Sequence, residues 1–451
     1  MKKILVIGAG RSTSSLISYL LKHSNRYNWH ITVADVSMDL ILSKTENHPN
    51  STALVFDVND AEQREKEIQS VDIVVSMLPA FMHSEVAKDC VRLKKHMATA
   101  SYVSDTMREL DSDARKNGIV LLNECGLDPG IDHASAMKVI DEIKEKGGTI
   151  HSFRSYCGGL VAPESNDNPW GYKFSWNPRN VILAGQGTAQ YLENGKLKFI
   201  PYNRLFTQTD TISIDGYGSF DAYANRDSIG YREPYGLQNI DTMLRGTLRM
   251  PGYCKAWNVF VKLGLTDDGY KIHGADQLTY TQLLEAFLPD KLKGSTKDKL
   301  IEFMRPEIDD DVVQKLEWLG LFSNLPIQLK EASPAQLLQN LLENKWLLKP
   351  NDKDMIVMQH QFEYTLNKQI HTLHSSLVVK GDDAIHTAMA KTVGLPLAII
   401  VKLLLTNQLQ LSGVQIPTSK EIYQPLLKEL EDLGIVFVEK EIKFQTLNPK
   451  S

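Results

Sequence analysis

The stretch KILVIGAGRST, residues 3–13, decides the fold class of this chain. A short apolar run with β-branched residues meets a Gly-x-Gly turn, and apolar residues then recur at helical spacing over 14–21. Strand, glycine turn and helix open a dinucleotide-binding βαβ unit, in which the second glycine lets a pyrophosphate approach the backbone. Thr13 stands where a third glycine is usual, so the turn alone also fits an ordinary strand–helix connection.

A second predicted strand, residues 30–34, runs into Asp35. A carboxylate at this position accepts hydrogen bonds from ribose hydroxyls and repels a 2′-phosphate, so the sequence predicts NAD as the preferred cofactor, with NADP as the alternative. A solvated loop carboxylate is the other interpretation of Asp35. The expected cofactor-binding residues all follow predicted strands or begin a helix, and they are Gly8, Gly10, Arg11, Ser12, Asp35, Asp57, Val58, Leu78, Pro79 and Ser101.

Length and charge set the broad class. The chain has 451 residues and a formal net charge of −5, which predicts about two to three domains and argues against a nucleic-acid surface. No signal-peptide pattern is found at the start. The longest apolar stretch, 393–405, is interrupted by Pro396 and Lys402 and predicts a buried helix, not a membrane span.

The four cysteines, Cys90, Cys125, Cys157 and Cys254, are scattered and form no CxxC pair. Neither a disulfide framework nor a metal site is therefore indicated, and a cytoplasmic location is expected.

Six predicted strands alternate with helices in the first 130 residues, which predicts an α/β fold with a Rossmann-like, doubly wound parallel sheet. Longer strands at 149–157, 210–215, 219–224, 355–366 and 370–379 lack regular intervening helices and predict a mixed sheet. A charged helical segment separates them, and a helix over 383–405 is expected to pack on the first sheet. The expected domains are 1–130 with 385–451 (dinucleotide-binding), 131–265 with 351–384 (mixed α/β, substrate) and 266–350 (helical insert).

Five polar, glycine-containing motifs stand in the middle of the chain: SYVS (101–104), GLDPGIDH (126–133), SYCGGLVAPESNDNPWGYKFSW (155–176), ANRDS (224–228) and RGTLR (245–249). With them the whole chain resembles the glutamate-forming saccharopine dehydrogenase (saccharopine reductase) family of lysine metabolism. The resemblance implies a Rossmann-like domain, a substrate and dimerisation domain, and a helical third domain. It also implies a reaction in which saccharopine, NAD(P)+ and water reversibly give L-glutamate and 2-aminoadipate 6-semialdehyde.

That chemistry needs groups that move protons near the cofactor, because hydride removal leaves an imine that is hydrated and then collapses. Asp128, Tyr102 and Cys157 match the family positions proposed for proton handling and substrate contact. Asp128 could instead cap the helix after Pro129, and Cys157 could be simple packing.

The substrate carries three carboxylates, for which guanidinium groups are natural partners. The expected substrate-binding residues are Ser101, Asp128, Cys157, Phe174, Arg226, Arg245 and Thr247. Arg245 could instead form an internal ion pair, and Phe174 could be core. A structural hydrogen bond is expected for His133, and solvated or paired positions for Arg232 and Arg249.

Two rival functions remain open from the sequence. A reductive condensation such as carboxynorspermidine synthesis would act on a polyamine and call for an acidic pocket with fewer arginines. A non-catalytic NAD-binding protein would not need Asp128, Cys157 and Arg226. The expected partners are saccharopine and a second copy of the chain in a homodimer.

Overall fold

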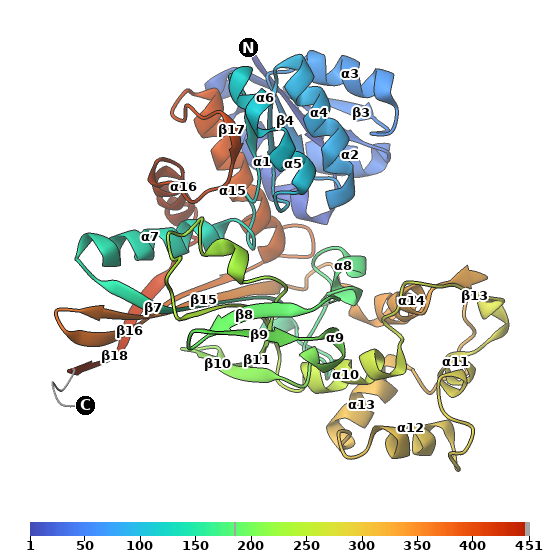
Figure 1. Ribbon diagram of the computed structural model, residues 1–451. Coiled ribbons are helices and arrows are strands. Elements are labelled where there is room, and N and C mark those ends of the chain that lie inside the picture. The colour runs from blue at the N-terminus through green and yellow to red at the C-terminus, as the bar shows by residue number, and fades with distance from the viewer. Residues whose placement is uncertain (185, 447–451) are drawn as a thin grey trace. The chain divides into compact units, whose positions relative to one another are not determined.

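The structure is a computed structural model that describes residues 1–184 and 186–446 (Figure 1). It contains two compact units. Unit 1 consists of Met1–Thr149, Thr365–Gln369 and Leu377–Glu439, and unit 2 consists of Ile150–Tyr364, Ile370–Ser376 and the segment from Lys440. Each unit has its own sheet, so two cores form at separate places along the chain.

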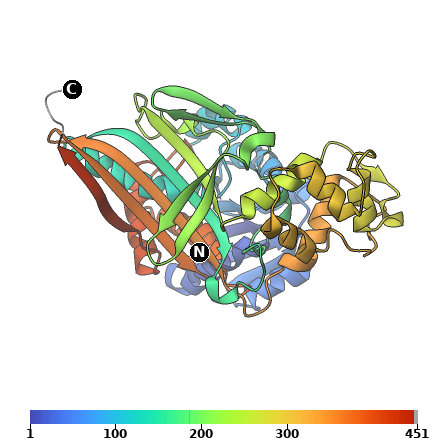
Figure 2. The ribbon, with the colours of Figure 1, turned by 90° about the horizontal axis from the view of Figure 1, so that it is seen from below.

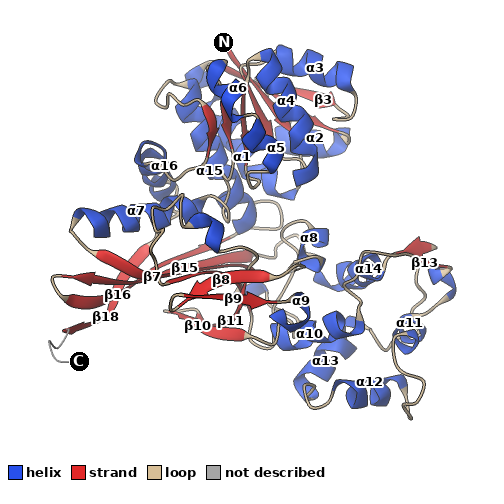
Figure 3. Cartoon of the chain, viewed as in Figure 1, coloured by secondary structure: helices blue, strands red, loops and turns tan. Residues whose placement is uncertain are grey.

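Unit 1 holds a seven-stranded sheet in the order β17-β6-β5-β4-β1-β2-β3. Every neighbouring pair is parallel, as expected of a doubly wound fold. Its strands are nearly all apolar because helices lie on both faces (Figure 3). They are β1 (Lys2–Ile7), β2 (Trp29–Asp35), β3 (Ser51–Val55), β4 (Ile73–Ser76), β5 (His96–Thr99), β6 (Val120–Leu122) and β17 (Gly413–Gln415).

The helices of unit 1 mostly alternate with its strands along the chain. They are η1 (Arg11–Thr13), α1 (Ser14–Tyr27), α2 (Met38–Thr45), α3 (Ala61–Gln69), η2 (Ala80–Met82), α4 (His83–Leu93), α5 (Asp105–Glu109), α6 (Asp111–Lys116), α7 (Ile131–Glu145), α15 (Ala388–Leu405) and α16 (Lys420–Asp432). α15 packs on α1, where a Cβ added to Gly394 would lie 2.7 Å from the backbone nitrogen of Leu16. The C-terminal part of the chain thus completes the first core.

The nine-stranded sheet of unit 2 follows the order β10-β11-β12-β7-β15-β16-β18, with β8 paired to β12 and to β9. β12 pairs parallel with β7 but antiparallel with β11 and β8, so the sheet is mixed. Its long strands run side by side in Figure 2. The strands are β7 (Thr149–Val161), β8 (Ala189–Glu193), β9 (Lys196–Ile200), β10 (Thr209–Ile214), β11 (Gly218–Ala224), β12 (Thr242–Arg249), β15 (Asp354–Leu366), β16 (Gln369–Lys380) and β18 (Val438–Thr446).

Helices and a small two-stranded sheet, β13-β14, complete unit 2. These elements are η3 (Pro163–Ser165), α8 (Pro178–Ile182), α9 (Tyr202–Leu205), η4 (Ile229–Tyr231), α10 (Tyr253–Leu263), β13 (Ile272–His273), η5 (Ala275–Gln277), α11 (Tyr280–Ala286), α12 (Thr296–Met304), α13 (Asp310–Leu319), β14 (Glu331–Ala332) and α14 (Pro334–Trp346). Serine or threonine N-caps with a Gln or Asp three residues later start α11, α12 and α14. These helices enclose an aromatic core that includes Trp170, Trp257 and Trp346.

The predicted fold class is confirmed, and the predicted buried helix over 393–405 lies within α15. By length and composition α15 is the one helix of the described chain that could cross a membrane, and 78% of it is buried inside the structure. The sequence did not predict α2, α8, α9, α10, β8, β9, β12, β13, β14, β17 and β18.

Candidate active site

The glycine turn after β1 uses its two glycines for different purposes. Gly8 has φ +104°, and a Cβ there would lie 3.0 Å from the carbonyl oxygen of Met77. Gly10 has φ −68° and ψ −174°, and a Cβ there would meet no atom within 4 Å. The fold therefore requires glycine at position 8, whereas position 10 keeps open space beside the backbone that leads into η1 and α1. A dinucleotide pyrophosphate fits that arrangement.

Asp35, at the end of β2, binds the same turn. Its Oδ2 accepts a hydrogen bond from the Ala9 N–H at 2.7 Å, and its Oδ1 accepts one from the Ser37 N–H at 3.1 Å. The carboxylate therefore fixes the backbone between the two glycines, a structural role in addition to those predicted for it.

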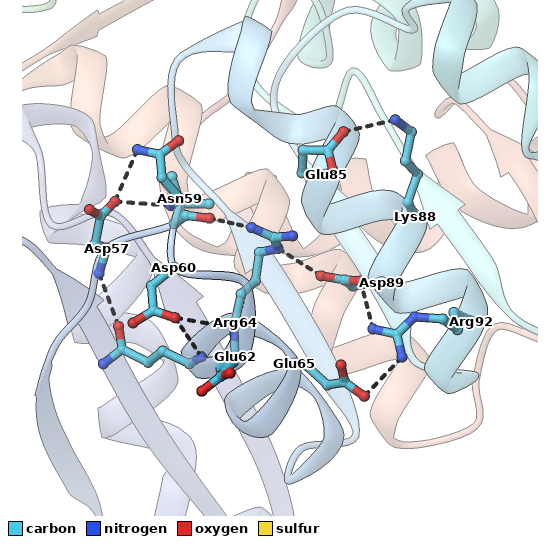
Figure 4. A network of polar contacts seen from close by, with 12 residues as sticks. Asp57, Asn59, Asp60, Glu62, Arg64, Glu65, Glu85, Lys88, Asp89 and Arg92 are labelled. Atoms are coloured by element: carbon cyan, nitrogen blue, oxygen red, sulfur yellow. Dashed lines mark hydrogen bonds and ion pairs between the residues drawn. The ribbon is translucent and has the colours of Figure 1, made fainter.

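The loop after β3 is held by a buried ion pair. Arg64 in α3 donates to the Val58 carbonyl at 2.5 Å and to the Asp89 carboxylate at 2.6 Å (Figure 4). Arg92 bridges Asp89 to a surface glutamate. The Asp57 carboxylate, exposed in this loop, accepts from the backbone and side chain of Asn59 and caps no helix, since Asp60 caps α3. Val58 is buried.

The carboxyl ends of β4 and β5 meet around a histidine that the sequence did not single out. His83 is buried and lies within 2.8 Å of the hydroxyls of Ser76 and Ser101. Leu78 and Pro79 lie between Ser76 and His83 in sequence, and Pro79 leads directly into η2. A single histidine with no second histidine or cysteine within a few residues matched no catalytic or metal-binding motif.

Asp128 lies on a tight loop between β6 and α7. The Gly126 N–H donates to the Pro129 carbonyl at 3.0 Å, and a Cβ on Gly130 would lie 2.0 Å from the Gly126 carbonyl oxygen, so the loop closes only with glycine at 130. Asp132 accepts from the Gly130 N–H, and Gly130, two residues after Asp128, is the N-cap residue of α7. The Tyr102 hydroxyl is 3.4 Å from the Asp128 Oδ1.

Glu124 and His133 form a buried pair beneath this loop. The His133 Nε2 is 2.7 Å from the Glu124 Oε2, while the Glu124 Oε1 accepts from the Val103 N–H at 3.0 Å. Both residues are at most 4% exposed. The structural hydrogen bond predicted for His133 is confirmed, and it ties the segment after β5 to α7.

In unit 2, three strands bring candidate substrate residues onto one face of the sheet. Thr247 of β12 is opposite Cys157 of β7 on one side and Tyr223 of β11 on the other. Arg245, two residues earlier, is opposite Ser155. Because paired residues and residues two apart point to the same face, these side chains share one surface.

Arg245 and Arg226 are held by one loop. The Arg245 N–H donates to the Ser228 Oγ at 2.8 Å, and the Asn225 N–H donates to the Arg245 carbonyl at 2.7 Å. Arg226, between them, is exposed and has φ +38°, which is uncommon for a residue other than glycine. The buried guanidinium of Arg245 lies 4.4 Å from the centre of the Tyr231 ring.

Arg249 corrects a prediction, because it is neither solvated nor in an ion pair with any described residue. It is 4% exposed, and its guanidinium lies 5.4 to 5.8 Å from the ring centres of Tyr172, Tyr223 and Tyr253. Phe174 is fully buried among the same aromatic rings, which favours the core alternative over a place at an entrance.

The four cysteines are buried, and none of them forms a disulfide in the described part of the chain. Within residues 1–184 and 186–446 no group of three or more His, Cys, Asp or Glu side chains is arranged to hold a metal ion.

Comparison with known proteins identifies relatives along the whole chain. A model described as the saccharopine dehydrogenase NADP binding domain matches residues 4–122, and one for the saccharopine dehydrogenase C-terminal domain matches residues 126–435. The mitochondrial alpha-aminoadipic semialdehyde synthase of Rattus norvegicus is 38% identical over 97% of this chain. This chain spans 47% of the length of that relative.

Two fungal proteins match at nearly full length. The saccharopine dehydrogenase [NADP(+), L-glutamate-forming] of Pyricularia oryzae is 35% identical, with 98% of this chain and 99% of the relative aligned. The solved structure of apo saccharopine dehydrogenase (L-Glu forming) from Saccharomyces cerevisiae superposes with a TM-score of 0.88 and 34% identity, covering 98% of this chain and 100% of that chain.

These findings contradict the predicted preference for NAD. The matching model is that of an NADP binding domain, and the fungal relatives are named for NADP(+). The physical reason lies in the two hydrogen bonds of Asp35 to the backbone of Ala9 and Ser37. Because the carboxylate also has this structural role, its presence after β2 does not by itself indicate which ribose the domain binds.

Proposed function

Because this chain belongs to the glutamate-forming saccharopine dehydrogenase family, we propose that it oxidises saccharopine with NADP+ and water to L-glutamate and 2-aminoadipate 6-semialdehyde, reversibly. The observation that carries the proposal is the near full-length match to fungal enzymes named for this reaction. The geometry of the candidate residues supports it in three respects: a dinucleotide turn, a proton-handling pair and a carboxylate-binding face.

The turn at Gly8–Gly10 is the part we propose for the dinucleotide. The open space beside Gly10 and the N–H groups that begin η1 and α1 suit a pyrophosphate. Arg11, exposed in the same turn, is the cation we propose for a further phosphate of the cofactor. When bound, NADP+ supplies the acceptor for the hydride removed from the substrate carbon.

Asp128 and Tyr102 are the residues we propose for proton transfer. The secondary amine of saccharopine must lose a proton as its neighbouring carbon is oxidised, and water must then be deprotonated to attack the resulting C=N bond. The Asp128 carboxylate can accept the proton of the amine, and it can also bind an ammonium group. The Tyr102 hydroxyl, 3.4 Å from Asp128, is close enough to exchange a proton with it after a small adjustment. Cys157, on the face it shares with Thr247, is proposed as a substrate contact.

Carboxylate recognition is assigned to Arg226 and Arg245, with Thr247 and Ser101 as neutral donors. A planar guanidinium binds a carboxylate through two parallel hydrogen bonds, which fixes orientation as well as charge. Arg226 combines exposure with a backbone fixed on both sides by Asn225 and Ser228, so its side chain starts from a defined position.

A spectrophotometric assay of purified protein with saccharopine and NADP+ or NAD+ tests the proposal. Arg226→Ala should lower kcat/KM for saccharopine by about a hundredfold, and Arg226→Lys should recover only part of it, because lysine lacks the bidentate geometry. Arg204→Ala, which removes an exposed arginine of the same unit, is the matched control and should leave kcat/KM within about twofold.

If the purified protein does not oxidise saccharopine, the assay distinguishes between the two rival functions. Absence of turnover with saccharopine, combined with reductive condensation of a polyamine with an aldehyde, would favour a carboxynorspermidine-synthase-like enzyme. Tight dinucleotide binding without turnover of either substrate would favour the non-catalytic protein. A homodimer and a cytoplasmic location stay predictions, and the rat relative is named as mitochondrial.

A further inference from the structure

His83 is the one buried histidine of unit 1 that joins two strand ends to a candidate substrate residue. It is the first residue of α4 and is 4% exposed. Its Nδ1 lies 2.8 Å from the hydroxyl of Ser76, the last residue of β4. Its Nε2 lies 2.8 Å from the hydroxyl of Ser101 and 3.4 Å from that of Thr99, the last residue of β5.

The imidazole is neutral at physiological pH. Burial lowers the pKa of His83 to about 4, so at pH 7 only one ring nitrogen carries a hydrogen and the other accepts. The hydrogen-bond partners decide which nitrogen this is.

Ser76 fixes the tautomer. Its side chain is fully buried, and His83 Nδ1 is the only partner of its hydroxyl in the described part of the chain. If Nδ1 carried the hydrogen, the Ser76 hydroxyl hydrogen would be buried without an acceptor, which is costly. Ser76 therefore donates to Nδ1, and the ring hydrogen is on Nε2, where it points to Ser101.

The backbone of Ser101 is fixed, so the contact between its hydroxyl and His83 Nε2 determines the direction of the hydroxyl hydrogen. Its N–H donates to the Thr99 Oγ1 at 3.2 Å, and its carbonyl accepts from the Glu124 N–H at 3.0 Å. With the backbone fixed, only the side-chain torsion and the hydroxyl rotor are left. A Ser101 oxygen that accepts from Nε2 keeps its hydrogen for another acceptor.

We propose that His83 is a positioning residue: as the Nε2–H tautomer it donates to Ser101 and thereby presents the Ser101 hydroxyl as a hydrogen-bond donor to a substrate carboxylate. The role rests on the proposed function, because it assigns the carboxylate to saccharopine. It requires no titration of His83 during turnover and no direct contact between His83 and substrate.

Two substitutions separate the two ring nitrogens. The amide of Gln reaches the position of Nε2, and the amide of Asn reaches that of Nδ1. His83→Gln should therefore keep the donor to Ser101 and hold KM for saccharopine within about threefold of wild type. His83→Asn should lose it and raise KM by about tenfold or more, since a hydrogen bond to a charged group is worth about that factor. Ser101→Ala should raise KM similarly, and adding His83→Asn to it should change KM no further.

Equal KM values for the Gln and Asn variants, or additive effects of His83→Asn and Ser101→Ala, would overturn the proposal. A wild-type protein that fails to oxidise saccharopine would instead remove the proposed function. An independent readout is the ring itself: in protein labelled with 15N-histidine, the resonances missing from His83→Gln should belong to a neutral Nε2–H ring at pH 7. A neutral Nδ1–H ring or a charged ring would also overturn the proposal.

Discussion

Two glycines two residues apart should respond in opposite ways to the same substitution. An added methyl group at Gly8 meets the Met77 carbonyl oxygen at 3.0 Å and has to adopt φ +104°. Backbone strain of this kind costs about 1–3 kcal/mol and overpacking about as much again, so Gly8→Ala should lower the free energy of unfolding by about 2–6 kcal/mol. At Gly10 the methyl group meets nothing and φ is −68°, so Gly10→Ala should be neutral or stabilise by up to about 1 kcal/mol.

Among the folded variants, we expect Gly10→Ala to weaken dinucleotide binding more than Gly8→Ala does, which is the reverse of their order in stability. If a pyrophosphate approaches the backbone at Gly10, a methyl group there occupies the approach and should weaken NADP+ binding at least tenfold, equivalent to about 1.4 kcal/mol. Gly118→Ala is a control in the same unit, because it has φ +67° but nothing within 4 Å of an added Cβ. It should lose only the strain energy and bind NADP+ as wild type does.

Urea unfolding followed by circular dichroism gives the stability of the three variants, and calorimetric titration with NADP+ gives affinity without reference to turnover. The reasoning is refuted if Gly10→Ala binds NADP+ with wild-type affinity, because the open space would then have no connection with the ligand. It is also refuted if Gly10→Ala destabilises the protein as much as Gly8→Ala, because the packing distances would then not govern stability.

Two further predictions concern stability. Lys402 of α15 is paired with Glu429 of α16 and is 9% exposed, so Glu429→Gln should cost about 3 kcal/mol by leaving a buried ammonium group unpaired. Lys402→Met should offset most of that loss in the double variant, and additive single effects in a urea double-mutant cycle would contradict the pairing. His83 should make stability decrease as the pH is lowered: its folded-state pKa of about 4 is below the ordinary 6.5, so the unfolded chain binds the extra proton first. Wild type should therefore lose about 2 kcal/mol more than His83→Gln between pH 7.5 and pH 5, and parallel pH profiles of the two proteins would refute the neutral ring.

Local sequence pattern was sufficient for the parallel sheet because its central strands carry runs of buried apolar residues, as in Ile4–Ile7 of β1 and in β4. It was insufficient for β12, the strand that organises unit 2. TMLRGTLR carries two arginines and a glycine, and no alternation marks it as a strand. Arg245 and Arg249 are tolerated inside because aromatic rings from separate segments, including Tyr231 and Tyr253, cover their guanidinium groups. These rings lie on other elements, and Tyr172, a further partner of Arg249, is 70 residues before β12, so the pattern of the strand itself does not reveal them.

The candidate site residues also divide into those that a local sequence pattern indicated and one that it did not. Asp128 and Arg226 were found because each stands in an unusual motif, with glycines or polar residues at the end of a predicted strand. His83 was missed because its meaning depends on Ser76, seven residues earlier, and on Ser101, eighteen residues later. A weak indication was present: a histidine at the start of the helix that follows a strand ending in serine, near the edge of a parallel sheet where ligands bind.

Asp35 shows where a residue-by-residue fingerprint fails. The electrostatic argument for NAD assumed that a carboxylate after β2 faces the ribose and has its oxygens available. Both oxygens instead accept backbone N–H groups, one of them from Ala9 between the two glycines. A carboxylate in this position therefore has a sufficient structural reason to be present, whichever dinucleotide binds.

Thr13 is a second position where a residue-by-residue fingerprint fails, because here an expected residue is missing. The third glycine of the fingerprint exists to let the first helix pack closely, and its absence looked like a defect. In this fold the close approach is between α1 and α15, and the glycine that permits it is Gly394, whose added Cβ would lie 2.7 Å from the Leu16 nitrogen. Thr13 instead donates its hydroxyl to the Gly10 carbonyl at 2.7 Å and tightens the turn. What the fold requires is a short distance at one helix face, and a residue almost four hundred positions away along the 451-residue chain can provide it.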